Sequence, residues 1–211
     1  FTINAPSSIA WAWKTQHYFT VSSPYDSPSP PSGWFDSGTS ITESVTSPTA
    51  GASGTRYICT GWTGTGSAPA SGSSTSVTFT ITQPSSMTWN WKTQYYLTMV
   101  TNPSNITSPS LEGWYDTGTS ATISTTAFVD IIPGSSRYRF NGWSTTDMAE
   151  ITNPTMSPTT VLMDKAKTVT ANYAIQYSVT LDQSGVGSDF TGTVATIDGV
   201  NYMRSGLPVS F

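Results

Sequence analysis

The sequence predicts an all-β protein made of tandem small modules, of the β-sandwich or β-grasp-like kind, with almost no helix. Charged residues make up only 9% of the chain, against roughly 25% in an average soluble domain. Serine, threonine, glycine and proline fill the gaps between short apolar runs, which is typical of strands joined by turns. Within these runs apolar residues alternate, and no window has the 3.6-residue period of a helix. The pattern also recurs along the chain, as a tandem-repeat protein requires.

The repeat consists of ordered motifs that occur two or three times. The matched segments are WAWKTQHYFTV at 11–21 with WNWKTQYYLTM at 89–99, GWFDSGTS at 33–40 with GWYDTGTS at 113–120, RYICTGW at 56–62 with RYRFNGW at 137–143, and a third start, VTANYAIQYSVTL, at 169–181. The copies lie 78 to 82 residues apart. This spacing predicts a first β module at 1–84, a second at 85–174, and the start of a third, incomplete or divergent module at 175–211.

Alternation within the first motif separates inward from outward side chains. The predicted inward sets are Ile9, Trp11 and Trp13, then Met87, Trp89 and Trp91, then Val169, Ala171 and Tyr173. Each tryptophan has a partner in the other copy, which favours core packing over a sugar-binding platform. The predicted core tryptophans are Trp11, Trp13, Trp34, Trp62, Trp89, Trp91, Trp114 and Trp143.

A turn-like segment precedes the second tryptophan motif. Residues 77–81 alternate as a strand does, residues 82–85 read TQPS, and the tryptophan motif follows directly. Two alternating runs joined by a short turn predict a β-hairpin.

Composition excludes several classes of function. The net charge is -4 and the few lysines and arginines are scattered, so no basic stripe for nucleic acid is present. No apolar run reaches the 18 residues of a membrane span. Cys59 is the only cysteine, which excludes an intrachain disulfide and a multi-thiolate metal site. We predict no cofactor and no metal, and composition favours the extracellular space.

Two Asp-x-Gly motifs, at Asp36 and Asp116, invite comparison with an aspartic peptidase, in which two carboxylates share a proton. Each motif follows a Gly-Trp pair, and Asp-x-Gly is also an ordinary turn. His17, the only histidine, is replaced by tyrosine in the other copies, and Cys59 by Phe140. We therefore expect no enzyme, and keep a peptidase as a remote alternative.

Two further features bear on modification and assembly. Asn105 begins the only N-glycosylation sequon, Asn-Ile-Thr, in a loop rich in proline and serine. The first residues, FTI, match FTI at 79–81, which is the late strand of a repeat, but the earlier part of that repeat is missing before residue 1. A strand without its partner exposes unpaired backbone groups that can bind another chain. The candidates for assembly by strand complementation are Phe1, Ile3, Val209 and Phe211.

The order of motifs resembles the divergent internalin-type B-repeats of long bacterial and archaeal surface proteins. GWYDTGTSATI, RYRFNGWS and NPTMSPTTVLMDKAKTVTANY carry the resemblance, which covers most of residues 1–181 and ends in the third copy. It implies secretion and surface display, and no catalytic residue. The sequence thus predicts a structural component of a filament, stalk or surface layer that associates with itself, with an adhesin or carbohydrate-binding array as the alternative.

Overall fold

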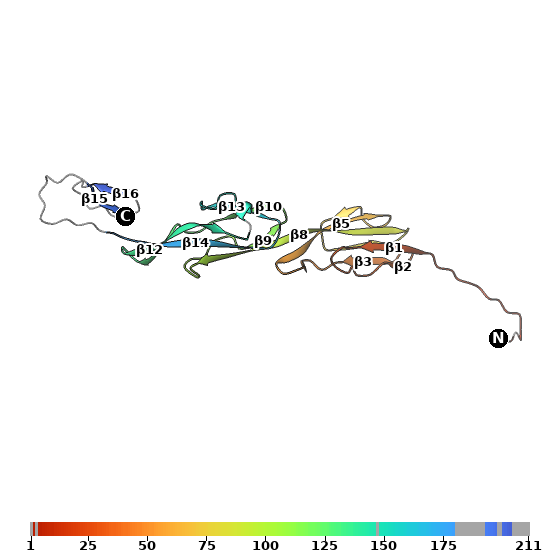
Figure 1. Ribbon diagram of the computed structural model, residues 1–211. Coiled ribbons are helices and arrows are strands. Elements are labelled where there is room, and N and C mark those ends of the chain that lie inside the picture. Colours follow the sequence, from red (N-terminus) through yellow and green to blue (C-terminus); the bar gives the residue numbers. More distant parts are fainter. Residues whose placement is uncertain (1, 3, 147, 180–192, 198–199, 204–211) are drawn as a thin grey trace. The chain divides into compact units, whose positions relative to one another are not determined.

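The chain folds into β-strands and loops. The computed structural model describes residues 2, 4–146, 148–179, 193–197 and 200–203 (Figure 1). Within this part the one helical element is a single 3-10 turn, η1 (Met148–Glu150). None of its helices is long and apolar enough to cross a membrane. The prediction of an all-β fold with almost no helix is confirmed.

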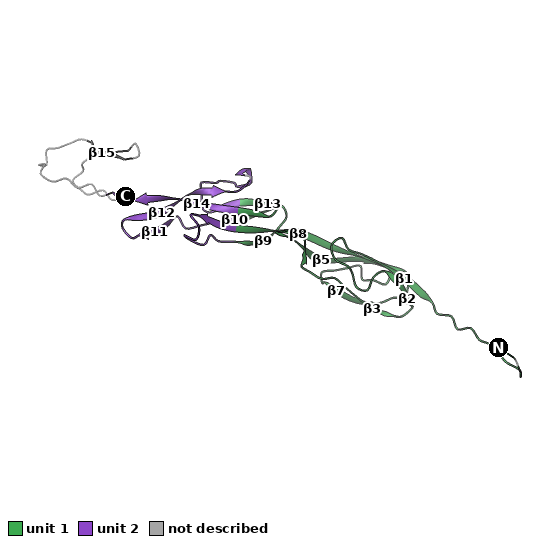
Figure 2. Ribbon diagram, turned by 60° about the horizontal axis from the view of Figure 1, so that its bottom comes forward, with its two compact units in different colours: residues 1–98, 112–121, 161–168 green, residues 99–111, 122–160, 169–211 purple. Residues whose placement is uncertain are grey.

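The strands divide between two compact units (Figure 2). Unit 1 comprises residues 1–98, 112–121 and 161–168, and unit 2 the remainder. The strands are β1 (Gln16–Ser22), β2 (Gly33–Asp36), β3 (Ser40–Ser44), β4 (Thr49–Ala50), β5 (Thr55–Thr65), β6 (Ser71–Gly72), β7 (Ser76–Thr80), β8 (Ser85–Asn102), β9 (Gly113–Asp116), β10 (Thr119–Ile123), β11 (Phe128–Ile132), β12 (Ser136–Ser144), β13 (Thr159–Met163), β14 (Lys167–Tyr177), β15 (Thr193–Ile197) and β16 (Val200–Met203). The predicted modules at 1–84, 85–174 and 175–211 stay a prediction.

Unit 1 packs two sheets around one core. In the larger sheet β8 lies between β5, to which it is antiparallel, and β1, to which it is parallel, and β2 pairs with β1. The smaller sheet consists of β3 and β7. Both sheets contribute to a single apolar cluster, and Phe19 of β1 meets Phe79 of β7 edge to face at 5.4 Å. The alternation of apolar residues follows from burial of one face of each sheet.

The structure corrects the predicted hairpin between residues 77–81 and the second tryptophan motif. β7 pairs with β3, with Ile41 opposite Phe79, whereas β8 pairs with β5 and β1. The segment at 82–85 therefore connects the two sheets, and the strands on either side of it are not neighbours. The apolar alternation of both strands is satisfied by the shared core between the sheets.

Two strand pairs in the chain have the same register. We call β5 and β12, which each contain a Gly-Trp step, the Gly-Trp strands, and β8 and β14, which come later in the chain, the closing strands. In the first pair Trp62 lies opposite Trp89, Cys59 opposite Trp91 and Arg56 opposite Gln94. In the second pair Trp143 lies opposite Ala171, Phe140 opposite Tyr173 and Arg137 opposite Gln176. Each pair has a register shift just before its Gly-Trp step.

The tryptophans do not all occupy core positions. Trp62, Trp89 and Trp143 are buried, and Trp91 and Trp114 are half-buried. The core prediction is wrong for Trp11, Trp13 and Trp34, which are 81%, 91% and 65% exposed. Trp11 and Trp13 lie in residues 5–15, which belong to no strand of the described part, so no neighbouring strand covers their rings. Ile9, predicted to face inward, is exposed for the same reason.

A glycine is required at the register shift of the first pair. Gly61 has φ +117°, and an added Cβ would collide with the carbonyl oxygen of Gly72. Gly38, in the turn after β2, has φ +88°, but a Cβ there would meet no atom within 4 Å. We expect Gly61→Ala to lower the free energy of unfolding by more than about 3 kcal/mol, and Gly38→Ala by about 1 kcal/mol, from backbone strain alone. Urea denaturation of both variants measures this, and equal losses would contradict the collision.

Candidate functional site: an open aromatic and polar face

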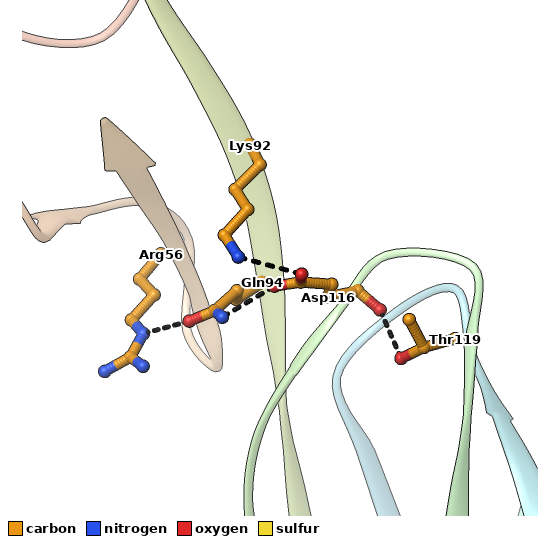
Figure 3. A network of polar contacts seen from close by, with 5 residues as sticks. All are labelled: Arg56, Lys92, Gln94, Asp116 and Thr119. Carbon is orange, nitrogen blue, oxygen red and sulfur yellow. Dashed lines mark hydrogen bonds and ion pairs between the residues drawn. The ribbon is translucent and has the colours of Figure 1, made fainter. Parts of the chain in front are cut away.

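A cluster of polar side chains stands beside the second tryptophan motif (Figure 3). Gln94 of β8 lies opposite Asp116 of β9, and its Nε2 donates a hydrogen bond of 2.7 Å to Asp116 Oδ1. Lys92 Nζ binds the other carboxylate oxygen at 2.8 Å. The turn after β9 is closed by Thr119 Oγ1, which donates to the Asp116 carbonyl at 2.7 Å. The Lys-x-Gln and Asp-x-Gly motifs are thus two halves of one cluster.

The first copy of the motifs builds the same cluster. Asp36 lies opposite Gln16, accepts a hydrogen bond of 2.9 Å from Gln16 Nε2, and pairs with Lys14 Nζ at 2.7 Å. In both copies the bonded lysine, and then the glutamine, lower the pKa of the aspartate below its ordinary value. The carboxylates are therefore charged at neutral pH.

The geometry does not favour the aspartic-peptidase reading of Asp36 and Asp116. In such a dyad one carboxyl has a raised pKa because two like charges share a site. Here each carboxylate is held by the lysine and glutamine of its own copy, and both pKa values are lowered. Each motif forms a turn between two strands that do not pair with each other. β2 pairs with β1 and β3 with β7, and in the second copy β9 pairs with β8 and β10 with β13.

The two copies differ in what covers the tryptophan of the Gly-Trp-aromatic-Asp motif. In the second copy Arg56 of β5 lies over the Trp114 ring, 4.5 Å from its centroid, and its Nε donates to Gln94 Oε1 at 2.8 Å. In the first copy Trp34 meets the Tyr18 ring edge to face at 5.3 Å and its side chain stays largely exposed. No arginine is found over Trp34 in the described part of the chain, so the ring face is open.

An open face therefore runs along the start of the first copy. We define it by Trp11, Trp13, Gln16 and Trp34. Its counterparts in the second copy are Trp89, Trp91, Gln94 and Trp114, each of which contacts or pairs with β5. The aromatic side chains of the open face are exposed, whereas their counterparts are buried or half-buried. The second copy thus has a neighbouring strand, β5, over the residues that stay uncovered in the first copy.

The other predicted candidates lie apart from this face. Cys59 is a free, buried thiol whose pKa is raised by burial. Asn105 is exposed at a turn with φ 61° in unit 2, where a glycan has access. His17 is half-buried opposite Phe35. No group of three or more metal-ligating side chains occurs in the part of the chain that the structure describes. Phe1, Ile3, Val209 and Phe211 lie outside the described residues.

Sequence reasoning missed a buried acid. Glu43 of β3 is 0% exposed, and neither carboxylate oxygen has a hydrogen bond of normal geometry to the described residues. Burial raises its pKa from 4.5 to about 7, although the neighbouring Trp89 side chain and Ser44 backbone act in the opposite direction. The signal was present in the alternation of Ile41, Glu43 and Val45, and in Ile123 at the matching position of the second copy.

Comparisons with known proteins give no further guide to the site. No family model, no curated protein and no solved structure matches the chain.

Proposed function

We propose that the chain is a structural protein of the cell exterior, a building block of a filament, stalk or surface layer made of tandem β modules. The observation that carries the proposal is the repeated pairing of a Gly-Trp strand with the closing strand that follows it in the chain. A strand that pairs with the Gly-Trp strand of the preceding repeat belongs to both repeats in sequence and so links them. Stiffness and length are then the useful properties.

Composition and resemblance support an extracellular position for this component. Few charges, abundant threonine and tryptophan, and a single buried cysteine suit a surface protein. The resemblance of the motifs to divergent internalin-type B-repeats points the same way. Self-association by strand complementation between subunits, at the assembly candidates Phe1, Ile3, Val209 and Phe211, is the proposed mode of assembly, because unpaired strands bind other strands.

Electron microscopy tests this function. We expect antibody against the chain to label the outside of intact cells, and negative-stain images of purified native material to show regular filaments, sheets or strings of modules. The intact mass of the native material should be measured alongside. Label confined to the cell interior, with isolated particles of 22.5 kDa, would contradict the proposal.

Glycan binding is the second candidate, favoured by one observation. Trp34 and Tyr18 present exposed rings beside the polar groups of Lys14, Gln16 and Asp36, which is the composition of a sugar-stacking surface. A glycan array with the whole chain would reveal such binding, and Trp34→Ala should abolish it. Trp114→Ala is the matched control, because Arg56 already covers the Trp114 ring. Retention of glycan binding in Trp34→Ala would remove this candidate.

A further inference from the structure

The open face of the first copy has the sequence of a closing strand but pairs with no Gly-Trp strand in the described structure. We propose that residues 7–16 are the closing strand of another repeat module, one whose Gly-Trp strand has no closing strand of its own. The module binds by pairing its Gly-Trp strand antiparallel to residues 7–16, with its arginine over Trp34. This inference names the partner in the proposed modular assembly and rests on that function.

The register of the pairing follows from the two closing strands within the chain. Trp62 and Trp143 lie opposite Trp89 and Ala171, and Arg56 and Arg137 lie opposite Gln94 and Gln176. Trp11 and Gln16 hold the corresponding places in residues 7–16. The Gly-Trp tryptophan of the partner would therefore lie opposite Trp11, and its arginine opposite Gln16.

The flanking sequence agrees with this assignment. Closing strand β8 begins Ser85-Ser86-Met87 after Pro84, and residues 6–9 read Pro-Ser-Ser-Ile. In β8 these first residues also pair in parallel with β1, with Phe19 opposite Ser85. A closing strand thus enters between two strands of the preceding module. Residues 7–10 match the start of β8 in sequence, but in the described structure they pair neither in parallel with a strand like β1 nor antiparallel with a Gly-Trp strand.

The uncovered ring of Trp34 independently supports the same occupant. Its counterpart Trp114 is covered by Arg56, which comes from the Gly-Trp strand and also binds Gln94. Arg137 makes the same bond to Gln176, at 3.1 Å. Trp34 and Gln16 have the ring and the amide for this arginine, but the described part of the chain supplies no arginine to either. One strand, bearing Arg-Tyr and Gly-Trp, would satisfy the whole open face.

The occupant is not a second copy of the described repeats. Both Gly-Trp strands in the described part of the chain are already paired, β5 with β8 and β12 with β14. A second copy would have to break one of these long pairings before it could bind. A module with a free Gly-Trp strand binds without that loss.

A fusion that supplies such a module tests the proposal. The fusion consists of an added copy of residues 16–84 followed directly by residues 7–211. Residues 7–16 then follow residue 84 of the added module, just as the start of β8 follows residue 84 in the chain itself. Residues 7–15 occur once in this fusion, and hydrogen exchange with mass spectrometry follows their peptide alone. We expect exchange of their amides to slow at least about a hundredfold relative to the whole chain of 211 residues.

Matched variants separate pairing from non-specific collapse. Trp11→Ala in the fusion should lose at least about tenfold of the protection, because its ring is expected to pack on the added Gly-Trp tryptophan. Tyr177→Ala, at a residue that is also exposed, should leave the protection unchanged.

Three results would overturn the proposal. The first is equal exchange of residues 7–15 in the fusion and in the whole chain. The second is an unfolded added module, because residues 7–16 would then have failed to close it. The third is protection in the whole chain that rises with its concentration, which would make a second copy the occupant. None of these bears on surface labelling, so the function and the pairing are tested separately.

Discussion

Replacing Glu43 with glutamine should raise the free energy of unfolding by about 3 kcal/mol at pH 8 and leave it nearly unchanged at pH 4. The folded protein holds this buried carboxyl with a pKa of about 7, against an ordinary value of 4.5. Between these two values the unfolded chain loses its proton while the folded chain keeps it. Stability therefore falls as the pH rises through this window, by about 1.4 kcal/mol per unit. Glutamine keeps the shape of the protonated acid and removes the titration.

The measurement is a series of urea denaturation curves from pH 4 to pH 8. Glu43→Ile should stabilise at least as much at pH 8, because isoleucine occupies the equivalent, fully buried position 123. Asp130→Asn is the control, since Asp130 is an exposed carboxylate on β11 and its replacement should leave the pH dependence in place. A Glu43→Gln variant with the pH dependence of the unmodified protein would contradict the burial of this side chain.

Trp89→Ala should lower the free energy of unfolding by about 4 kcal/mol, whereas Trp34→Ala should lower it by less than about 1 kcal/mol. Trp89 is 1% exposed and meets Trp62 edge to face at 5.5 Å, so its removal leaves a cavity in the apolar core of unit 1. Trp34 contacts one ring and is largely exposed. Both substitutions remove a tryptophan side chain, so the difference between their effects reports the difference in burial between Trp89 and Trp34.

Chemical denaturation followed by circular dichroism checks this pair. The midpoint should shift for Trp89→Ala, with little change for Trp34→Ala. Equal losses would mean that the exposed ring of Trp34 is held by contacts that the structure does not contain. A small loss for Trp89→Ala would mean that the closing strand contributes little to unit 1.

The sequence identified the residues of the site as repeated positions, but it did not show their contacts. The repeat placed Lys92, Gln94 and Asp116 in matched positions, but spacing alone could not show that β8 and β9 pair and bring the three side chains together. The arginine of the Gly-Trp motif was visible as a repeated residue. Its contact with Trp114 depends on β5 lying beside β8, which is a long-range pairing.

The sequence by itself determined the all-β class, the repeated motifs and the alternation of side chains along each strand. These features are local, because strand geometry places every second residue on the same face. Tertiary structure decided which strand neighbours which: β7 joined β3 and not β8, and the same Trp-x-Trp motif was covered in β8 and exposed in residues 5–15. Alternation tells which side chains share a face, but burial of that face depends on a partner strand that can lie anywhere in the chain or in another module.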